Sequence, residues 1–166
     1  MDQDLKYMQM AYELANKAIE IDEVPVGALI VYNGEIIATA YNQREINQQA
    51  TSHAEILCIQ EACKKLHSWR LDECELYVTL EPCMMCTGAI IQSRIKRVVY
   101  GASEKRWLAC KEILNMNPNY FNHHPEVVSG IMEEECSEQI SQYFKNKRKK
   151  KTIENYEMNP VIWTPK

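Results

Sequence analysis

A His-Ala-Glu tripeptide and a Cys-x-x-Cys pair are the residues of this chain whose types and spacing could do chemistry. His53 and Glu55 belong to the tripeptide, and Cys83 and Cys86 form the pair that follows. One imidazole and two thiolates are ligands typical of zinc, and they leave a fourth tetrahedral position for water. Zinc with such an open position lowers the pKa of its water to around 7, which suits hydrolysis. The pattern therefore predicts a catalytic site with one Zn²⁺ per chain.

Two other interpretations of these residues remain open from the local sequence. Ser52 and Glu55 have the spacing of a capping box, in which Glu55 would bond the backbone of Ser52. Without His53, the cysteine pair would fit a redox motif or half of a structural zinc ribbon. A glutamate beside a zinc ligand can also accept the proton of zinc-bound water and pass it to a substrate nitrogen. The combination of the four residues favours the hydrolytic zinc site.

Hydrophobic periodicity predicts an α/β fold. The stretch from Leu5 to Asp22 has an apolar stripe that runs from Leu5 to Ile19 at helical spacing. The apolar run from Val26 to Tyr32 leads into the hairpin signal Asn33-Gly34, and burial of that strand on both faces implies helices on both sides of the sheet. The expected helices cover 5–22, a stretch from about 53, 83–93, 105–114 and 131–149, and the expected strands cover 26–32, 35–41, 75–79, 97–100 and 126–129.

The expected helix starts place the candidate ligands. His53 would open one helix, and Pro82 at a first turn puts Cys83 and Cys86 one turn apart on the next. Free amide hydrogens and the positive end of the helix dipole stabilise thiolates at such a position. Both helix starts could therefore face one metal ion.

Length and charge indicate one domain with a basic end. At 166 residues the chain suits a single domain, expected over 1–151, with loops at 42–50 and 115–125 and an irregular tail at 152–166. The run from Lys145 to Lys151 carries six positive charges, so the rest of the chain carries −10 against −4 for the whole. A basic arm on an acidic body suits a polyanion, although a helix end with solvated lysines would have the same composition.

Cysteine usage and hydropathy indicate the compartment. Seven cysteines, an odd number, and an N-terminus without a signal-peptide pattern predict reduced thiols and a cytoplasmic location. No apolar segment approaches the ~20 residues that a membrane span needs. We therefore expect no membrane partner.

At the zinc-type residues the chain resembles the zinc-dependent nucleoside and base deaminases, whose His-x-Glu and Pro-Cys-x-x-Cys signature it shares. Within that superfamily it is similar to the bacterial tRNA-specific adenosine deaminases over 5–101, and again at 121–123 and 130–149. The resemblance implies a cytidine-deaminase-like, three-layer α/β/α sandwich around a mixed sheet of about five strands. It also implies a homodimer that converts adenosine to inosine at the wobble position of a tRNA anticodon.

Carried over residue by residue, the histidine and the two cysteines would bind zinc, and Glu55 would shuttle the proton while zinc hydroxide attacks purine C6. Asn42 matches the family position that hydrogen-bonds the target nucleoside; a loop asparagine satisfied by the backbone is the alternative. Phe144 and the basic run after it match an RNA-contacting helix, with core packing as the alternative for Phe144. The other substrate-binding candidates for the anticodon stem-loop are Val26, Asn122, Lys147 and Arg148.

One segment departs from the family pattern. Where the family has a loop of small residues containing glycine, this chain reads Ser103 to Cys110, with Trp107 inside it. That loop borders the RNA site in the family, so Trp107 could stack on a base, pack against the body or close the pocket toward small substrates. A deaminase of free guanine, cytosine or adenosine is therefore the alternative enzyme. A non-catalytic RNA-binding subunit is a third hypothesis, and the presence of Glu55 weighs against it.

Overall fold

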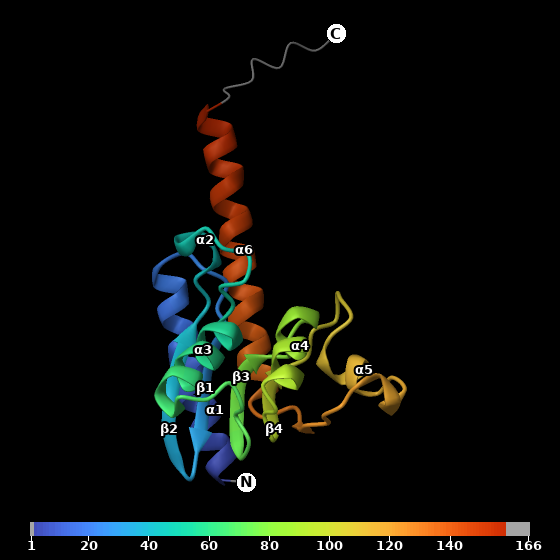
Figure 1. The fold of residues 1–166 in the computed structure, drawn as a ribbon. Helices are drawn as coiled ribbons and strands as arrows, with labels where there is room; N and C mark the ends of the chain where they lie inside the picture. Colours follow the sequence, from blue (N-terminus) through green and yellow to red (C-terminus); the bar gives the residue numbers. More distant parts are fainter. Residues whose placement is uncertain (1, 159–166) are drawn as a thin grey trace.

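Helices and strands are interspersed along the described chain (Figure 1). The computed structural model describes the backbone of residues 2–158 and the side chains of residues 2–154. None of the described helices is both long enough and apolar enough to cross a membrane. The helices are α1 (Asp2–Glu20), α2 (Arg44–Asn47), α3 (Ala54–Leu66), α4 (Met84–Gln92), α5 (Cys110–Leu114) and α6 (Glu133–Met158), with a 3₁₀ turn at Pro118–Tyr120. The strands are β1 (Gly27–Tyr32), β2 (Glu35–Tyr41), β3 (Cys74–Leu80), β4 (Arg97–Ala102) and β5 (Glu126–Val128).

The described strands form one mixed, five-stranded sheet in the order β2-β1-β3-β4-β5. Strand β1 pairs antiparallel with both β2 and β3, whereas β3, β4 and β5 run parallel. Helices α1 and α6 pack on one face of the sheet, and α3 and α4 pack on the other (Figure 1). The expected three-layer α/β/α sandwich is therefore confirmed.

Alternate residues of the central strands point into two different cores. Ile30 and Val78 belong to the core under α3 and α4, whereas Leu29 and Tyr77 belong to the core under α1 and α6. Successive side chains leave a strand from opposite faces, so a strand buried on both faces must be apolar at nearly every position. This requirement accounts for the unbroken apolar run that precedes the hairpin.

The β1–β2 hairpin turns at Asn33 and Gly34, as predicted. Their φ angles of 50° and 77° are the left-handed pair that a two-residue turn of this kind needs. Glycine and asparagine reach such angles at low cost, because glycine has no Cβ atom and the asparagine side chain is short. Strand β2 is an edge strand of the sheet. The turn returns the chain so that Tyr41, at the end of β2, lies opposite the start of β1.

The buried face of α1 differs from the expected stripe. Leu5 is 53% exposed and Ile19 is 39% exposed, while Asp4 of the same helix is buried. Asp4 can be buried because Arg97 forms a 2.6 Å ion pair with it and the Tyr77 hydroxyl donates to it at 2.7 Å. The hydrogen bond from Arg97 holds the pKa of the Asp4 carboxyl below its usual range. A paired charge therefore sets the rotation of this helix, and hydropathy does not reveal it.

Three further segments differ from expectation. The short helix α2 interrupts the loop expected at 42–50, and within 105–114 only α5 is helical. Helix α6 continues to Met158, so the expectation of an irregular tail is wrong for residues 152–158. Neither glycine nor proline occurs between Glu133 and Met158, so nothing in that sequence stops the helix. The rest of the expected tail, 159–166, lies outside the described residues.

Replacing Gly27 by alanine is expected to destabilise the fold, because α1 passes directly over the start of β1. A Cβ atom at Gly27 would overlap the backbone atoms Ala11 O and Ala15 N of α1. Overpacking of this kind should lower the free energy of unfolding in urea by about 1–3 kcal/mol. Gly88→Ala is the matched control, since nothing lies within 4 Å of an added Cβ there and alanine favours helix. Equal destabilisation by the two substitutions would contradict the close packing of α1 on β1.

Candidate metal centre

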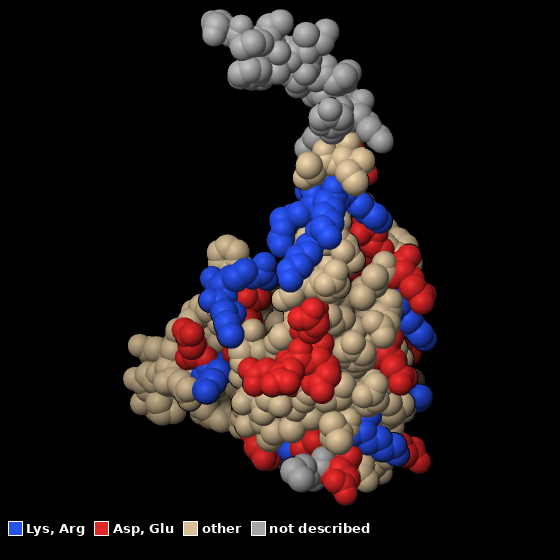
Figure 2. Space-filling view, turned by 180° about the vertical axis from the view of Figure 1, so that it is seen from behind, with Lys and Arg blue, Asp and Glu red and all other residues tan. Residues whose placement is uncertain are grey.

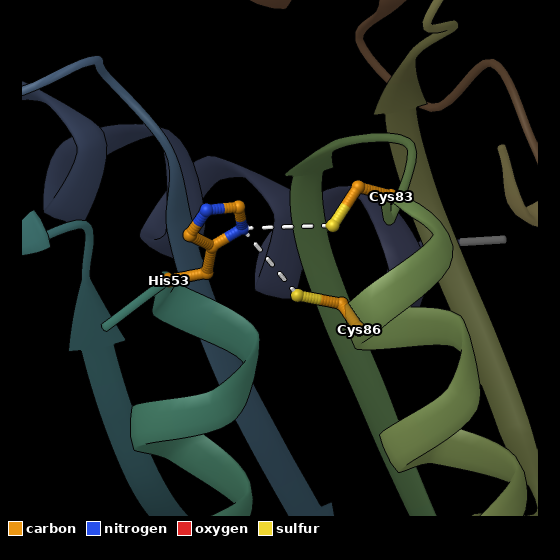
Figure 3. A group of neighbouring side chains, drawn as sticks. All are labelled: His53, Cys83 and Cys86. Carbon is orange, nitrogen blue, oxygen red and sulfur yellow. Dashed lines mark hydrogen bonds between the residues drawn. The ribbon is translucent and has the colours of Figure 1, made fainter. Parts of the chain in front are cut away.

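The three zinc-type side chains come from the first residues of two helices that start at the same end of the sheet. His53 is the N-cap of α3 and Cys83 is the N-cap of α4, and neither side chain forms a capping hydrogen bond. Cys86 lies one turn further along, within α4. His53 and Cys83 thus occupy N-cap positions without a side-chain hydrogen bond to the helix backbone. Their side chains point instead into the space between the two helices, where they meet Cys86 (Figure 3).

The distances between these side chains fit a tetrahedral zinc ion. Nδ1 of His53 lies 3.6 Å from Sγ of Cys83 and 3.6 Å from Sγ of Cys86. The three ligand atoms all lie within 4.8 Å of one another. Zinc–sulfur bonds of about 2.3 Å and zinc–nitrogen bonds of about 2.0 Å at a tetrahedral angle place nitrogen about 3.5 Å from sulfur. Both the donor set and its spacing therefore fit zinc.

Hydrogen bonds inside the cluster prepare the thiols for a cation. The hydrogen bond with Cys86 lowers the pKa of the Cys83 thiol to about 4, so this thiol is ionised at neutral pH. The same contact, together with burial, raises the pKa of Cys86. The hydrogen bond with Cys83 also raises the pKa of His53. The two thiols therefore share a proton, which a divalent cation would release on binding.

Glu55 lines the same pocket as His53 and Cys83. It is only 4% exposed, and burial raises the pKa of its carboxyl. The capping-box interpretation is wrong, because His53 is the N-cap and the Ser52 hydroxyl donates to Oε1 of Gln49. A buried carboxyl with a raised pKa beside zinc-type ligands is suited to take up and release a proton during a reaction.

A pocket of about 370 Å³ opens over the cluster. It lies where β2, β3 and β4 end and β1 begins, which is the edge at which open α/β sheets bind ligands. Three of the predicted substrate-binding residues, Val26, Asn42 and Phe144, are among its walls. The lining residues are Val24, Val26, Asn42, Arg44, His53, Glu55, Leu80, Glu81, Cys83, Glu104, Arg106, Trp107 and Phe144.

The positions of Asn42 and Phe144 argue against their alternative roles. The Asn42 backbone N–H, rather than its side chain, donates to Val26 O at 3.0 Å, and the side chain lines the pocket. Phe144 is half-buried and belongs to neither core cluster of the described chain. The guanidinium carbon of Arg106 lies 5.6 Å from the centre of the Phe144 ring. Phe144 is therefore a wall of the pocket and not a core residue.

Three other predicted substrate contacts lie outside the pocket lining. The Lys147 ammonium is 3.8 Å from the carboxylate of Asp22, which follows α1. Arg148 is exposed and lines a neighbouring groove. Asn122 is exposed, and the imidazole of the next residue donates to Ile95 O at 2.6 Å. Ile95 lies just before β4 begins, so Asn122 is near the end of that strand that is far from the pocket. Their roles in substrate binding stay predictions.

The residues that hold the pocket walls are not predicted by the sequence patterns. Glu81 is 6% exposed and accepts two backbone hydrogen bonds from the segment after β4. Glu23 is 1% exposed and accepts a 2.7 Å hydrogen bond from the N–H of Ile46 in α2. Trp107 lines the pocket mouth and is 67% exposed, so it does not pack against the body. The sequence did offer one signal for the two glutamates, since each directly precedes a motif that shapes the site. Glu23 precedes an apolar run, and Glu81 precedes the Pro-Cys motif.

Comparisons with known proteins agree with this geometry. A family model described as MafB19-like deaminase matches residues 2–149. A tRNA-specific adenosine deaminase of Bacillus subtilis is 51% identical over 152 residues, covering 91% of this chain and 94% of that protein. A protein of the same name from Haemophilus influenzae is 43% identical, in an alignment that covers 91% of this chain and 88% of that protein.

Solved structures agree as well. One from a study of A-to-I editing by tRNA:A34 deaminases at the wobble position has a TM-score of 0.77 and 40% identity, covering 81% of this chain and 98% of its own. Guanine deaminase from Bacillus subtilis has a TM-score of 0.57 and 40% identity, but covers 59% of this chain and 63% of its own. Given the family match along most of its length and relatives of one kind at 43% and 51% identity, the chain belongs to the tRNA-specific adenosine deaminase family.

Proposed function

We propose that the protein deaminates adenosine to inosine at the wobble position of a tRNA anticodon. The observation that carries this proposal is the buried Glu55 carboxyl, which lines one pocket with His53 and Cys83 of a His-Cys-Cys set spaced for zinc. The relatives named tRNA-specific adenosine deaminase, and the neighbour from the study of wobble editing, support the choice of substrate. The reaction consumes one water and releases one ammonia, leaving a carbonyl oxygen on purine C6.

Three side chains would hold the metal and a fourth would move the protons. His53, Cys83 and Cys86 would hold a zinc ion, which would supply the acidity that brings the pKa of water to around 7. Glu55 accepts one water proton on a carboxylate oxygen and carries it to the ring nitrogen beside C6. It then delivers the second water proton to the leaving amine. Burial raises the pKa of Glu55, so its carboxyl can hold a proton between these transfers.

The pocket walls would bind the target nucleoside and its neighbours. The Asn42 amide can hydrogen-bond the nucleoside, and Val26 offers an apolar surface beside it. An anticodon loop must splay its bases apart before one of them enters such a pocket. At the mouth, Trp107 and Phe144 offer aromatic faces, with Arg106 over the Phe144 ring. Stacking on such faces stabilises unpaired bases of any sequence.

The basic end of α6 is the proposed contact for the RNA backbone. Figure 2 shows Lys and Arg side chains gathered where α6 leaves the body, in contrast to the acidic side chains on the body below. Arg148 of this cluster shares a groove with Arg106 and Phe144 of the pocket wall. Phosphate contacts of this kind carry no sequence information, and they supply affinity that falls as salt rises.

We further propose that the protein is a cytoplasmic homodimer. The family resemblance implies a dimer, and apolar side chains on and near α4 support a contact surface outside the pocket lining. Met84 is 63% exposed and Met116 is 40% exposed. All seven cysteines are free thiols, which is typical of a reducing compartment.

The protein is expected to form inosine in an anticodon stem-loop that carries adenosine at the wobble position. Free guanine, cytosine, adenosine and cytidine lack the flanking nucleotides that the pocket mouth would stack, so they should release ammonia far more slowly. Inosine is measured by nuclease digestion and chromatography, and ammonia by a coupled assay. A stem-loop with its only loop adenosine outside the wobble position is the control. Turnover of guanine without inosine formation in the RNA would overturn the proposal in favour of a base deaminase.

Glu55→Gln should lower kcat by about 10²–10⁴-fold, because the amide cannot carry the proton. Metal analysis of this variant should still find about one zinc per chain, since His53, Cys83 and Cys86 complete the three-ligand site. His53→Ala is the comparison variant and should lose both zinc and activity. Unchanged kcat in Glu55→Gln would remove the glutamate from the proposed mechanism, and zinc loss in that variant would make it a metal ligand.

Replacing Lys145, Arg148 and Lys149 by alanine should flatten the salt dependence of stem-loop binding. If each contacts one phosphate, the slope of log Kd against log salt should fall by about 2 in magnitude. Fluorescence anisotropy of a labelled stem-loop measures this slope. Lys64→Ala with Lys65→Ala is the control, because these lysines lie at the far end of α3 from the pocket. An unchanged slope in the triple variant would mean that the helix end is only solvated.

A further inference from the structure

Glu81 is a buried carboxylate with both oxygens bound to the main chain of one segment. It is 6% exposed and follows β3 directly. Its Oε1 accepts a 3.1 Å hydrogen bond from the N–H of Glu104, and its Oε2 accepts one of 2.9 Å from the N–H of Lys111. Hydrogen bonds from backbone N–H groups to an ionised carboxylate are about twice as strong as those between neutral groups. One side chain therefore ties down both ends of the segment between β4 and α5.

We call residues 103–109, between β4 and α5, the rim loop. Its ends are also tied by backbone contacts: the N–H of Glu81 donates to Ala102 O at 2.8 Å, and the N–H of Cys110 donates to Pro82 O at 3.0 Å. An isolated bridge pairs Cys83 with Ala109. The rim loop is thus fastened along the segment that leads from β3 to the metal ligands.

Between its tied ends, the rim loop presents side chains to the pocket. The backbone N–H of Glu104 donates to Glu81, and the Glu104 side-chain carboxylate forms a 3.1 Å ion pair with Arg106. Arg106 lies over the Phe144 ring, and Trp107 lines the pocket mouth while 67% exposed. A loop without regular structure loses conformational entropy for each residue that becomes ordered. Contacts that already order the loop in the free protein remove this entropy loss from substrate binding.

We infer that Glu81 is a positioning residue that holds the rim loop in its substrate-binding arrangement. The inference rests on the proposed function, because it assigns the loop to binding of the nucleotides around the target adenosine. The reacting groups have supports of their own: Glu55 and His53 lie at the start of α3, and Cys86 lies within α4. Cys83, two residues after Glu81, is held as the N-cap of α4, where its carbonyl oxygen accepts from the N–H of Thr87 at 2.8 Å. Loss of the Glu81 contacts therefore acts on KM for the RNA and leaves the chemical step in place.

Glu81→Gln tests this role with little change in side-chain size. The amide keeps one acceptor oxygen and sets an NH₂ group against the N–H of Glu104 or Lys111, which breaks one tie. We expect KM for the anticodon stem-loop to rise about tenfold with kcat within about threefold of wild type and the zinc content unchanged. Zinc loss, or a fall in kcat with KM constant, would overturn the inference, because Glu81 would then support the metal ligands.

Glu75→Gln is the matched control for a merely structural effect. The Glu75 carboxylate accepts from the Tyr77 hydroxyl at 3.0 Å and from Arg97 at 3.3 Å, near the start of β3 and thus at the opposite end of that strand from Glu81. This variant also alters a carboxylate that accepts two hydrogen bonds, here from side chains, and it should leave KM unchanged. A similar rise in KM for the Glu75 and Glu81 variants would overturn the positioning role.

A double-mutant cycle links Glu81 to the rim loop. Trp107→Ala should raise KM for the stem-loop by itself, and adding Glu81→Gln should raise it little further, because residues that act through one element are not additive. Fully additive increases would overturn the inference. Failure of the wild-type protein to form inosine would instead overturn the proposed function. Normal wild-type turnover with an unchanged KM in Glu81→Gln would overturn only the role of Glu81.

Discussion

The site depends on one topological constraint, which is that two helices begin at the same edge of the sheet. Helix α4 connects the parallel strands β3 and β4, so it must start where β3 ends. Helix α3 leads from β2 to β3, and these strands share a direction because each is antiparallel to β1. It therefore starts where β2 ends, which is the same edge. His53 and Cys83 are the N-caps of these helices, so the crossovers bring together ligands that lie 30 positions apart.

Two opposing effects act on Glu55 at the start of α3. The positive end of a helix dipole favours a carboxylate by about 0.3–1 kcal/mol, which would lower its pKa. Burial disfavours the charged form and raises the pKa, by several units for fully buried groups. The pKa of Glu55 is raised, and burial is the largest cause of the shift. The same helix-end environment beside Cys83, which is half-buried and hydrogen-bonded to Cys86, leaves a thiol with a pKa of about 4. One edge of the sheet thus holds an anionic ligand and a protonatable carboxyl side by side.

Much of the sheet and the set of candidate metal ligands could be predicted from the sequence, because residue types that are recognisable without the fold mark them. Asn33-Gly34 marks the hairpin within two residues, and the ligand types are diagnostic together. The rotation of α1 could not be predicted, since it depends on the Asp4–Arg97 pair, 93 positions apart. The hydrogen bonds of Glu81 could not be predicted either, because a lone glutamate does not indicate its partners Glu104 and Lys111. Periodicity carries no information about such pairings, which form only once the sheet has brought the segments together.

The fastening of the rim loop keeps this segment in place beside the candidate metal ligands. Its ends are fixed by the Glu81 carboxylate and by the backbone of Pro82 and Cys83, and such bonds do not depend on which side chains lie between them. Bulk at Trp107 is directed outward to the pocket mouth, where it is 67% exposed. The side chains that would select the substrate can therefore vary while the ligands stay in place. The proposed reacting groups and the proposed substrate contacts therefore lie in separate parts of the same pocket wall.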